Sequence, residues 1–173
     1  MSDATGSNEI RLRRVEGTVF RAIRPEVLAH VLDPPLADHV GRYHAAGQPA
    51  LYISPRREWA ARAGDFNTRA DGAPRIVVAL ALQPAFVFDQ HDEAACAALG
   101  IDREQSNSSW RESLAEGRRP PSWDTADAVR AIGADGLIDR SRQIAGGWHV
   151  VLFRWNQLGG PRISVVGNSR DSE

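Results

Sequence analysis

The segment from Gly41 to Arg62 carries side chains that suit a ligand with phosphates, sugar hydroxyls and a flat ring. It holds a cation at Arg42, aromatic rings at Tyr43 and Tyr52, and a hydroxyl at Ser54, in the run GRYHAAGQPALYISPRREWAAR. The planar guanidinium of an arginine binds phosphate through paired hydrogen bonds. Two glycines in the same run let the backbone approach a ligand closely. The segment therefore predicts a binding site rather than only part of a packed core.

The composition is that of an ordinary globular domain. Of 173 residues, 42% are hydrophobic and 25% are charged, and a chain of this length can form a core without disulfides or metals. The formal net charge of −1 gives no basic field, so nucleic acid is not an expected partner. All 21 basic residues are arginine. The single cysteine, Cys96, excludes a disulfide framework, and we expect it to be buried.

The sequence shows no signal that would direct the chain out of the cytoplasm. No apolar run approaches 18 residues, and the polar start MSDATGSNE lacks the pattern of a signal peptide. We therefore expect a cytoplasmic protein with no membrane contact. We also expect no metal cofactor.

Hydrophobic periodicity and Gly/Pro breaks predict one α+β domain at residues 11–166, between flexible tails at 1–10 and 167–173. Strands are predicted at 15–23, 50–54, 75–82, 136–139, 149–155 and 162–166, with a further apolar run at 85–89. Helices are predicted at 25–32, 55–64, 92–99, 106–117 and 125–132, and a polar loop at 65–74. Short strands and helices without regular alternation favour small mixed or antiparallel sheets. No Walker or dinucleotide glycine loop is present.

Four stretches, in this order, resemble the RES domain, the toxin half of bacterial RES–Xre toxin–antitoxin pairs. They are VFRAIRP (19–25), GRYHAAGQPALYIS (41–54), FDQHDEAACAALGID (88–102), and AIGADGLIDRS with GGWHVVLF (131–153). The resemblance implies a fold similar to ADP-ribosyltransferases and cleavage of the nicotinamide–ribose bond of NAD. Some members transfer ADP-ribose to a protein, including a phosphoribosyl-pyrophosphate synthetase. Others use phosphate or water as the acceptor and deplete NAD.

The resemblance assigns roles to individual residues. Arg21 and Arg42 match family arginines and would bind the pyrophosphate of NAD. Tyr52 matches a tyrosine at a strand end and would stack on nicotinamide. Ser141 matches the family serine and would orient the nicotinamide ribose. From the residues alone, a surface salt bridge is the favoured role of Arg21, and Tyr52 could equally be a half-buried core residue.

Three further residues of the first segment are candidates for NAD binding. Tyr43 stands where the family usually has tryptophan or phenylalanine. His44 stands where asparagine is common, and it would either bind a ribose hydroxyl or lie in solvent. Ser54 would either reach the ligand or cap the helix predicted to start at Pro55, and the cap is the favoured single role.

One family residue is missing. The family's glutamate falls eleven residues after the tyrosine, where this chain has Ala63. A carboxylate there would stabilise the positive charge that develops on the ribose. Glu58 is the candidate replacement, with Asp65 as a second, although the residues alone favour a surface pair between Glu58 and Arg62 one helical turn later.

The expected function is therefore that of a toxin that acts on NAD and is paired with an Xre-type antitoxin. ADP-ribosyl transfer to a protein is favoured over NAD breakdown, because a missing glutamate fits a slow, target-specific transferase better than a fast glycohydrolase or phosphorylase. An inactive module that keeps only the antitoxin surface is the alternative from a different class.

Overall fold

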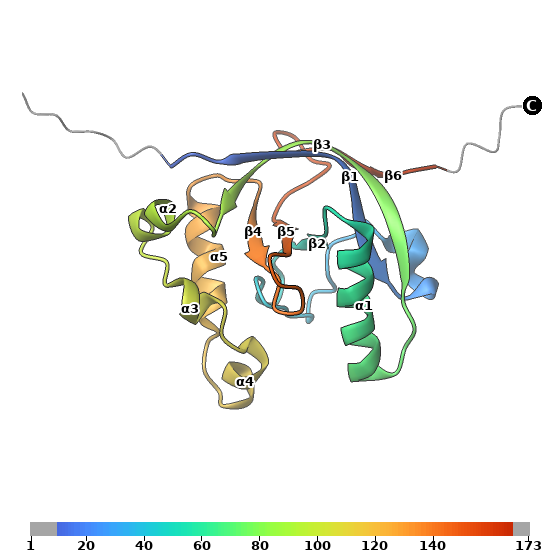
Figure 1. The fold of residues 1–173 in the computed structure, drawn as a ribbon, viewed down its shortest axis with the longest axis horizontal. Coiled ribbons are helices and arrows are strands. Elements are labelled where there is room, and N and C mark those ends of the chain that lie inside the picture. The colour runs from blue at the N-terminus through green and yellow to red at the C-terminus, as the bar shows by residue number, and fades with distance from the viewer. Residues whose placement is uncertain (1–9, 168–173) are drawn as a thin grey trace, which may run out of the picture.

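Strands β1 (Arg13–Ile23) and β3 (Ile76–Asp89) form a long antiparallel pair that spans the molecule (Figure 1). The computed structural model describes residues 10–167, so most of both predicted tails lies outside the described residues. Beyond β3 the sheet continues with β4 (Gly136–Arg140), β5 (Trp148–Leu152) and β2 (Leu51–Ile53). Only β3 and β4 are parallel among these neighbours, and β6 (Ile163–Val165) pairs separately with β3.

The sheet curls back on itself. Beyond the end of β2, Ser54 bonds to Phe20 of β1 through two backbone hydrogen bonds, each 2.8 Å long. The first and last strands of the path therefore meet at one point, and the space between them is enclosed by the sheet.

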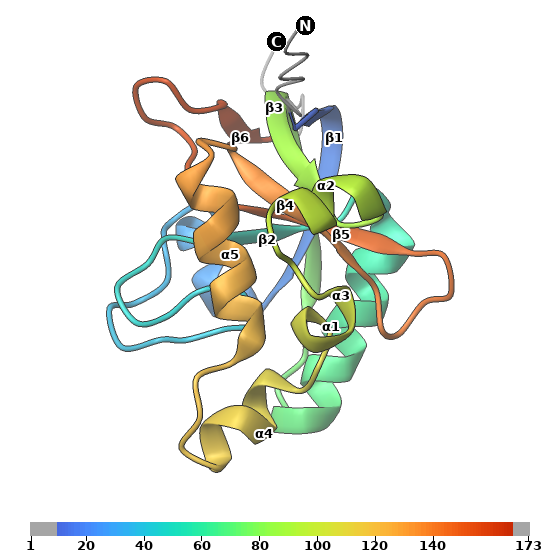
Figure 2. The ribbon, with the colours of Figure 1, turned by 90° about the vertical axis from the view of Figure 1, so that its left-hand side faces the viewer.

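Helices cover the sheet from two sides. Helix α1 (Arg57–Asp71) packs on β1 and β3, and α5 (Pro121–Ala131) lies on the opposite side of β2, β4 and β5 (Figures 1 and 2). The remaining helices are short: the 3₁₀ helix η1 (Pro25–His30), α2 (Glu93–Ala98), α3 (Arg103–Ser106) and α4 (Trp110–Ala115).

The central strands are buried on both faces, so the core forms two clusters. Ile138, Val150 and Leu152 point into the cluster that lies inside the curled sheet, where they meet residues of β1 and β3. Their strand neighbours Leu137 and Val151 point into the cluster beneath α5 and α2. Because alternate side chains of a strand point to opposite faces, one apolar run supplies both clusters. Cys96 is buried in the second cluster, as predicted.

The α+β class is confirmed, but helix α1 is longer than predicted. The predicted end at Gly64 and the polar loop at 65–74 are wrong, since the helix continues to Asp71 and ends at Gly72, whose φ is +71°. Gly64 is buried inside the helix, where a Cβ would lie 2.9 Å from the Cβ of Ala22. The glycine thus permits close packing of α1 on β1 and does not end the helix.

Strand β3 also passes through an expected break. Gln83 and Pro84 lie within it, opposite an irregularity at which Val15 and Gly17 of β1 pair with Ala85 and Leu82. A bulge tolerates proline because the ladder hydrogen bond is already interrupted there.

Two predicted helices have different bounds. The helix predicted at 106–117 is shorter than expected, since only α4 lies within this range, with Ser109 accepting the capping hydrogen bond from the backbone of Glu112. The helix predicted at 125–132 begins four residues earlier, because Pro121 occupies its first turn.

Asp135 and the second glycine of the GADG motif, Gly136, have structural roles. A Cβ on Gly136 would lie 2.0 Å from the carbonyl oxygen of Val151, so β5 can approach β4 only at a glycine. The buried Asp135 accepts hydrogen bonds from the backbone of Phe86 at 2.8 Å and from Nε of Arg154 at 2.6 Å. The GADG motif, which is one part of the family resemblance, therefore provides contacts that hold β3, β4 and the end of β5 together.

Candidate functional site

A cleft lies between α1, the adjoining ends of β2, β4 and β5, and the loop that carries Arg42. It has an inner part of about 230 Å³ and an outer part of about 640 Å³. Six residues line both parts, which makes the space continuous: Arg42, Tyr52, Ala63, Asn67, Asp139 and His149. A cleft of this size can take a dinucleotide-like ligand.

Small residues of α1 form one wall of the inner part. Ala60, Ala63, Gly64 and Asn67 recur at helical spacing and all line it. Strand residues form the opposite wall. Asp139 of β4 is the register partner of His149 of β5, whose ring bonds to Ser54 beyond the end of β2.

Arg21 reaches the inner part from β1. Its guanidinium donates to the carbonyl oxygen of Val31, and no described carboxylate lies within ion-pair distance of it. Burial lowers the pKa of Arg21 from 12.5 to about 10, so the side chain stays charged at neutral pH. A partly buried cation without a counter-ion is unfavourable, and a bound anion would relieve this cost.

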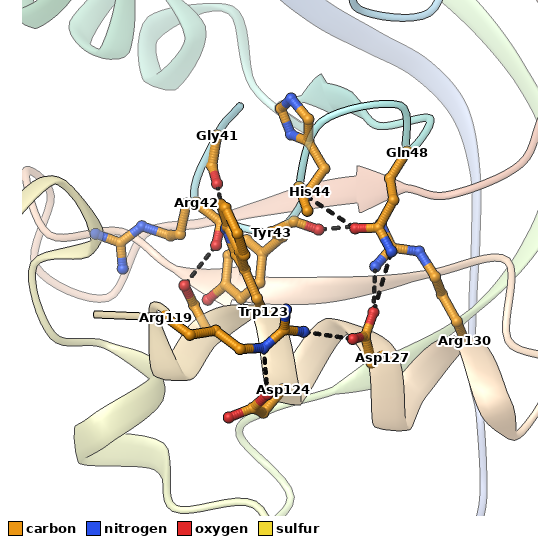
Figure 3. A network of polar contacts seen from close by, with 12 residues as sticks. Gly41, Arg42, Tyr43, His44, Gln48, Arg119, Trp123, Asp124, Asp127 and Arg130 are labelled. Carbon is orange, nitrogen blue, oxygen red and sulfur yellow. Dashed lines mark hydrogen bonds and ion pairs between the residues drawn. The ribbon is translucent and has the colours of Figure 1, made fainter. Parts of the chain in front are cut away.

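Arg42 belongs to a loop that α5 holds by its backbone (Figure 3). Trp123 donates to the carbonyl oxygen of Gly41 at 2.8 Å, Ser122 donates to that of Arg42, and Arg130 donates to that of Tyr43 at 3.0 Å. Three successive carbonyl groups are thus fixed by one helix. The Arg42 side chain remains free to line both parts of the cleft, where its only described side-chain partner is the amide oxygen of Asn107 at 3.4 Å.

Tyr52, His44 and Tyr43 form a hydrogen-bonded group beside the cleft. The Tyr52 hydroxyl accepts from the backbone N–H of Tyr43 at 3.0 Å and lies 2.9 Å from Nδ1 of His44. Burial raises the pKa of Tyr52, so the hydroxyl stays protonated and donates to that nitrogen. Tyr52 can therefore offer a ligand its ring, while its hydroxyl is already bound within the protein.

Tyr43 does not line the cleft, unlike the other NAD-binding candidates. It is 0% exposed, and its hydroxyl donates to Oδ1 of Asp139 at 2.6 Å. The same hydroxyl accepts from the amide of Gln90 at 3.2 Å. Tyr43 thus supports a cleft residue and has no surface for NAD.

Ser54 does not cap helix α1, which begins at Arg57 without a side-chain cap. Its Oγ lies 2.8 Å from Nδ1 of His149 instead. Burial lowers the pKa of His149, which favours the neutral ring. Ser54, His149 and Asp139 are the residue types of a nucleophilic triad, but no hydrogen bond joins His149 to Asp139 in the described structure, and Ser54 is buried.

Ser141 lines the outer part, where its Oγ accepts from the backbone N–H groups of Gln143 and Ile144. Arg142 follows it and donates to Asn107 at 3.1 Å. Arg42 and Arg142 thus share one neutral amide oxygen, and neither forms an ion pair with a described acidic residue. The outer part is therefore rich in unneutralised positive charge.

Glu58 and Asp65, the two candidate replacement carboxylates, both lie on α1 and are not in the cleft. The side chain of Glu58 is 68% exposed. Its Oε1 lies 3.8 Å from a guanidinium nitrogen of Arg56, so Glu58 pairs with Arg56 and not with Arg62. Asp65 is also exposed and lines neither part. Ala63 does line both parts, so the position where the family has glutamate faces the cleft here with only a methyl group.

Sequence reasoning missed Asp139 and His149. A signal existed, since each is a polar residue in an otherwise apolar strand run, GLID and HVVLF. Asn107 and Arg142 carried no comparable signal, because both lie in polar segments.

The described residues hold neither a cluster of metal ligands nor a membrane-spanning helix. Within residues 10–167, no group of three or more His, Cys, Asp or Glu side chains is gathered to hold a metal ion. None of the helices in that range is long and apolar enough to cross a membrane.

Together, the curled mixed sheet and the arginine-lined cleft under α1 define an α+β domain with a cleft of a size that can take a ligand. The chain belongs to the RES domain family, which matches residues 11–171, and the predicted family is confirmed. Its fold is similar to a chain in the crystal structure of the M. tuberculosis MbcT-MbcA toxin-antitoxin complex. The TM-score is 0.60 at 12% identity, over 90% of this chain and 86% of that chain. A search of curated proteins found no match.

Proposed function

We propose that this chain is the toxin of a toxin–antitoxin pair, and that it cleaves NAD and transfers ADP-ribose to a protein. Membership in the RES domain family and the fold shared with a chain of a toxin–antitoxin complex support the toxin role. They also support an antitoxin as partner. The family resemblance implies that this antitoxin is of the Xre type. The pair would act in the cytoplasm, and a phosphoribosyl-pyrophosphate synthetase is the acceptor that the resemblance offers.

The observation that carries the NAD part is the cation at Arg21, which is partly buried and has no ion-pair partner among the described residues. NAD contains a pyrophosphate, and an arginine binds such a group through charge-assisted hydrogen bonds. Arg42 supplies a second cation to the same inner part of the cleft. Two arginines without ion-pair partners among the described residues suit one doubly charged group better than a neutral ligand.

The Tyr52 ring supports a flat group beside the pyrophosphate. Its hydroxyl is bound to His44 and to the Tyr43 backbone, which holds the ring in place against the cleft. Nicotinamide stacked there would lie near the wall formed by α1. In the reaction, the bond between ribose C1′ and the nicotinamide nitrogen breaks, and its electron pair leaves with nicotinamide. The acceptor then bonds to C1′ and releases a proton.

Transfer to a protein is favoured over rapid NAD breakdown because position 63 lacks the family's carboxylate while still facing the cleft. Isotope-labelled NAD incubated with the chain and a bacterial extract tests this. Label appearing on a protein supports transfer, whereas fast nicotinamide release without protein label supports a glycohydrolase or phosphorylase.

Arginine variants test the binding site. Arg21→Ala and Arg42→Ala should abolish toxicity and weaken NAD binding by about tenfold to 150-fold, the equivalent of one charged hydrogen bond of about 1.5–3 kcal/mol. Arg62→Ala is the matched control, because Arg62 is exposed on α1 and lines neither part of the cleft. Wild-type toxicity and NAD affinity in both cleft variants would refute the proposed site.

A further inference from the structure

We propose that Asp139 is the carboxylate that stabilises the positive charge on the ribose during NAD cleavage. This inference rests on the proposed function and assigns a catalytic residue to it. The charge would come from strand β4 instead of helix α1, where the family has its glutamate and this chain has Ala63.

Asp139 is placed where such a group must act. Among the described residues it is the only Asp or Glu that lines the inner part of the cleft, and the only one that lines the outer part. It shares the inner part with Arg21, Arg42 and Tyr52. A ligand held by the arginines and the Tyr52 ring would therefore have one carboxylate within the same space.

A buried relay holds the Asp139 side chain. Ser106 donates to the side-chain oxygen of Gln90 at 3.0 Å, and Gln90 donates to the Tyr43 hydroxyl at 3.2 Å and to the carbonyl oxygen of Ile138 at 3.0 Å. Tyr43 in turn donates to Oδ1 of Asp139 at 2.6 Å. Ser106, Gln90 and Tyr43 are all buried. Groups fixed in this way do not need to reorganise when charge develops, which is what makes a catalytic electrostatic contact effective.

The second carboxylate oxygen is available to a ligand. Oδ2 of Asp139 accepts no hydrogen bond from a described residue, and no arginine within residues 10–167 lies within ion-pair distance of the carboxylate. Four charged or titratable neighbours act on the pKa of the Asp139 carboxyl group: Arg42, Tyr43, His149 and Arg142. Burial is the largest effect and raises the pKa of Asp139 above that of a free carboxyl, while these four neighbours act in the opposite direction and limit the rise.

The chemical step needs no further reagent. As the C1′–nitrogen bond of NAD breaks, the electron pair goes to nicotinamide and neutralises its ring. Positive charge then spreads over C1′ and the ribose ring oxygen, opposite the anionic Asp139. The acceptor bonds to C1′, its proton goes to solvent, and Asp139 is unchanged at the end. Asp139 touches the reacting sugar, whereas Tyr43 is a positioning residue that acts through it.

The experiment compares nicotinamide release with NAD affinity in the full chain. Asp139→Asn should reduce the single-turnover release of nicotinamide by about a hundredfold to a thousandfold, the range for one preorganised electrostatic contact. NAD affinity should stay within about threefold of wild type, because the arginines that bind phosphate are intact. Glu58→Gln and Asp65→Asn are matched controls that remove exposed carboxylates from α1, and neither should change the rate.

The pH profile distinguishes positioning from a loss of fold. Tyr43→Phe removes a hydrogen bond to the ionised Asp139, so the acid limb of its rate profile should move to higher pH, with a rate about tenfold lower at the plateau. If Asp139→Asn does not fold, this shift decides the question. An unmoved acid limb in Tyr43→Phe, or a rate within threefold of wild type in a folded Asp139→Asn, would overturn the assignment. Absence of nicotinamide release by the wild-type chain, even with extract, would instead refute the proposed function.

Discussion

The hydroxyl group of Tyr52 lies 2.9 Å from Nδ1 of His44, and the two rings are tilted by 56° to one another. Since the same hydroxyl accepts from the Tyr43 backbone, its hydrogen points to His44 and that nitrogen must carry none. His44 is only 5% exposed, and its Nε2 has no partner among the described groups. The histidine predicted to bind a ribose hydroxyl is thus a neutral support for the Tyr52 ring.

This arrangement predicts a pH-dependent stability. Burial, with Arg130 and His39, lowers the pKa of His44 from 6.5 to about 4 in the folded chain. Between these values the unfolded chain binds more protons, so the stabilising effect is complete above pH 6.5 and is lost as the pH falls toward 4. The loss between pH 7 and pH 5 should be about 2 kcal/mol.

Urea unfolding at several pH values measures this loss. His44→Asn is the control, because its amide can accept from Tyr52 but does not titrate. The difference between the two chains isolates His44 from the carboxylates. Parallel curves for the two would mean that His44 does not cause the loss.

Gly64 should tolerate no side chain, although alanine favours helices by about 1 kcal/mol over glycine. In Gly64→Ala the new Cβ would lie 2.9 Å from the Cβ of Ala22, which is fixed to the backbone of β1. We expect a net loss of about 1–3 kcal/mol in the free energy of unfolding.

A double variant tests the cause. Adding Ala22→Gly should restore much of the stability, since it removes the opposing methyl group. Ala61→Gly, elsewhere in α1, should cost about 1 kcal/mol through helix propensity alone. A Gly64→Ala chain more stable than wild type would contradict the close packing.

Asp135 should matter for stability and not for chemistry. Asp135→Asn removes the charge that faces Arg154, so the free energy of unfolding should fall by about 2–3 kcal/mol. Nicotinamide release per folded molecule should not change, because Asp135 lines neither part of the cleft.

Asp124→Asn is the matched control for the Asp135–Arg154 ion pair. Asp124 and Arg119 form an ion pair in which the side chains are 72% and 49% exposed, and its loss should cost under about 1 kcal/mol. Equal effects of the two substitutions would argue against a structural role for the GADG aspartate.

Trp123 should affect NAD binding without touching the ligand. Trp123→Phe removes the hydrogen bond to the Gly41 carbonyl, which helps to fix the loop that carries Arg42. NAD affinity should fall by about threefold to tenfold, in line with one neutral hydrogen bond. Trp59→Phe is the control, since Trp59 lines neither part of the cleft. Unchanged affinity in Trp123→Phe would mean that the loop is held well enough by Ser122 and Arg130.

The sequence by itself was enough to predict the family, the α+β class and the elements whose signals are local. Asp92 caps α2 and accepts from the Ala95 backbone, and Gly100 follows that helix with a φ of +66°. Such features depend on a few neighbouring residues, so a single sequence records them.

The tertiary structure alone decided which residues meet in the cleft. Tyr43 and Asp139 are bonded although 96 residues separate them, because the β4 register and the hold of α5 on the Arg42 loop bring them together. It also decided that Gly64 continues α1, since the space beside Ala22 is set by another strand. Glu58 and Asp139 are both acidic residues in the sequence, and only packing between distant elements exposes the first and turns the second toward the cleft.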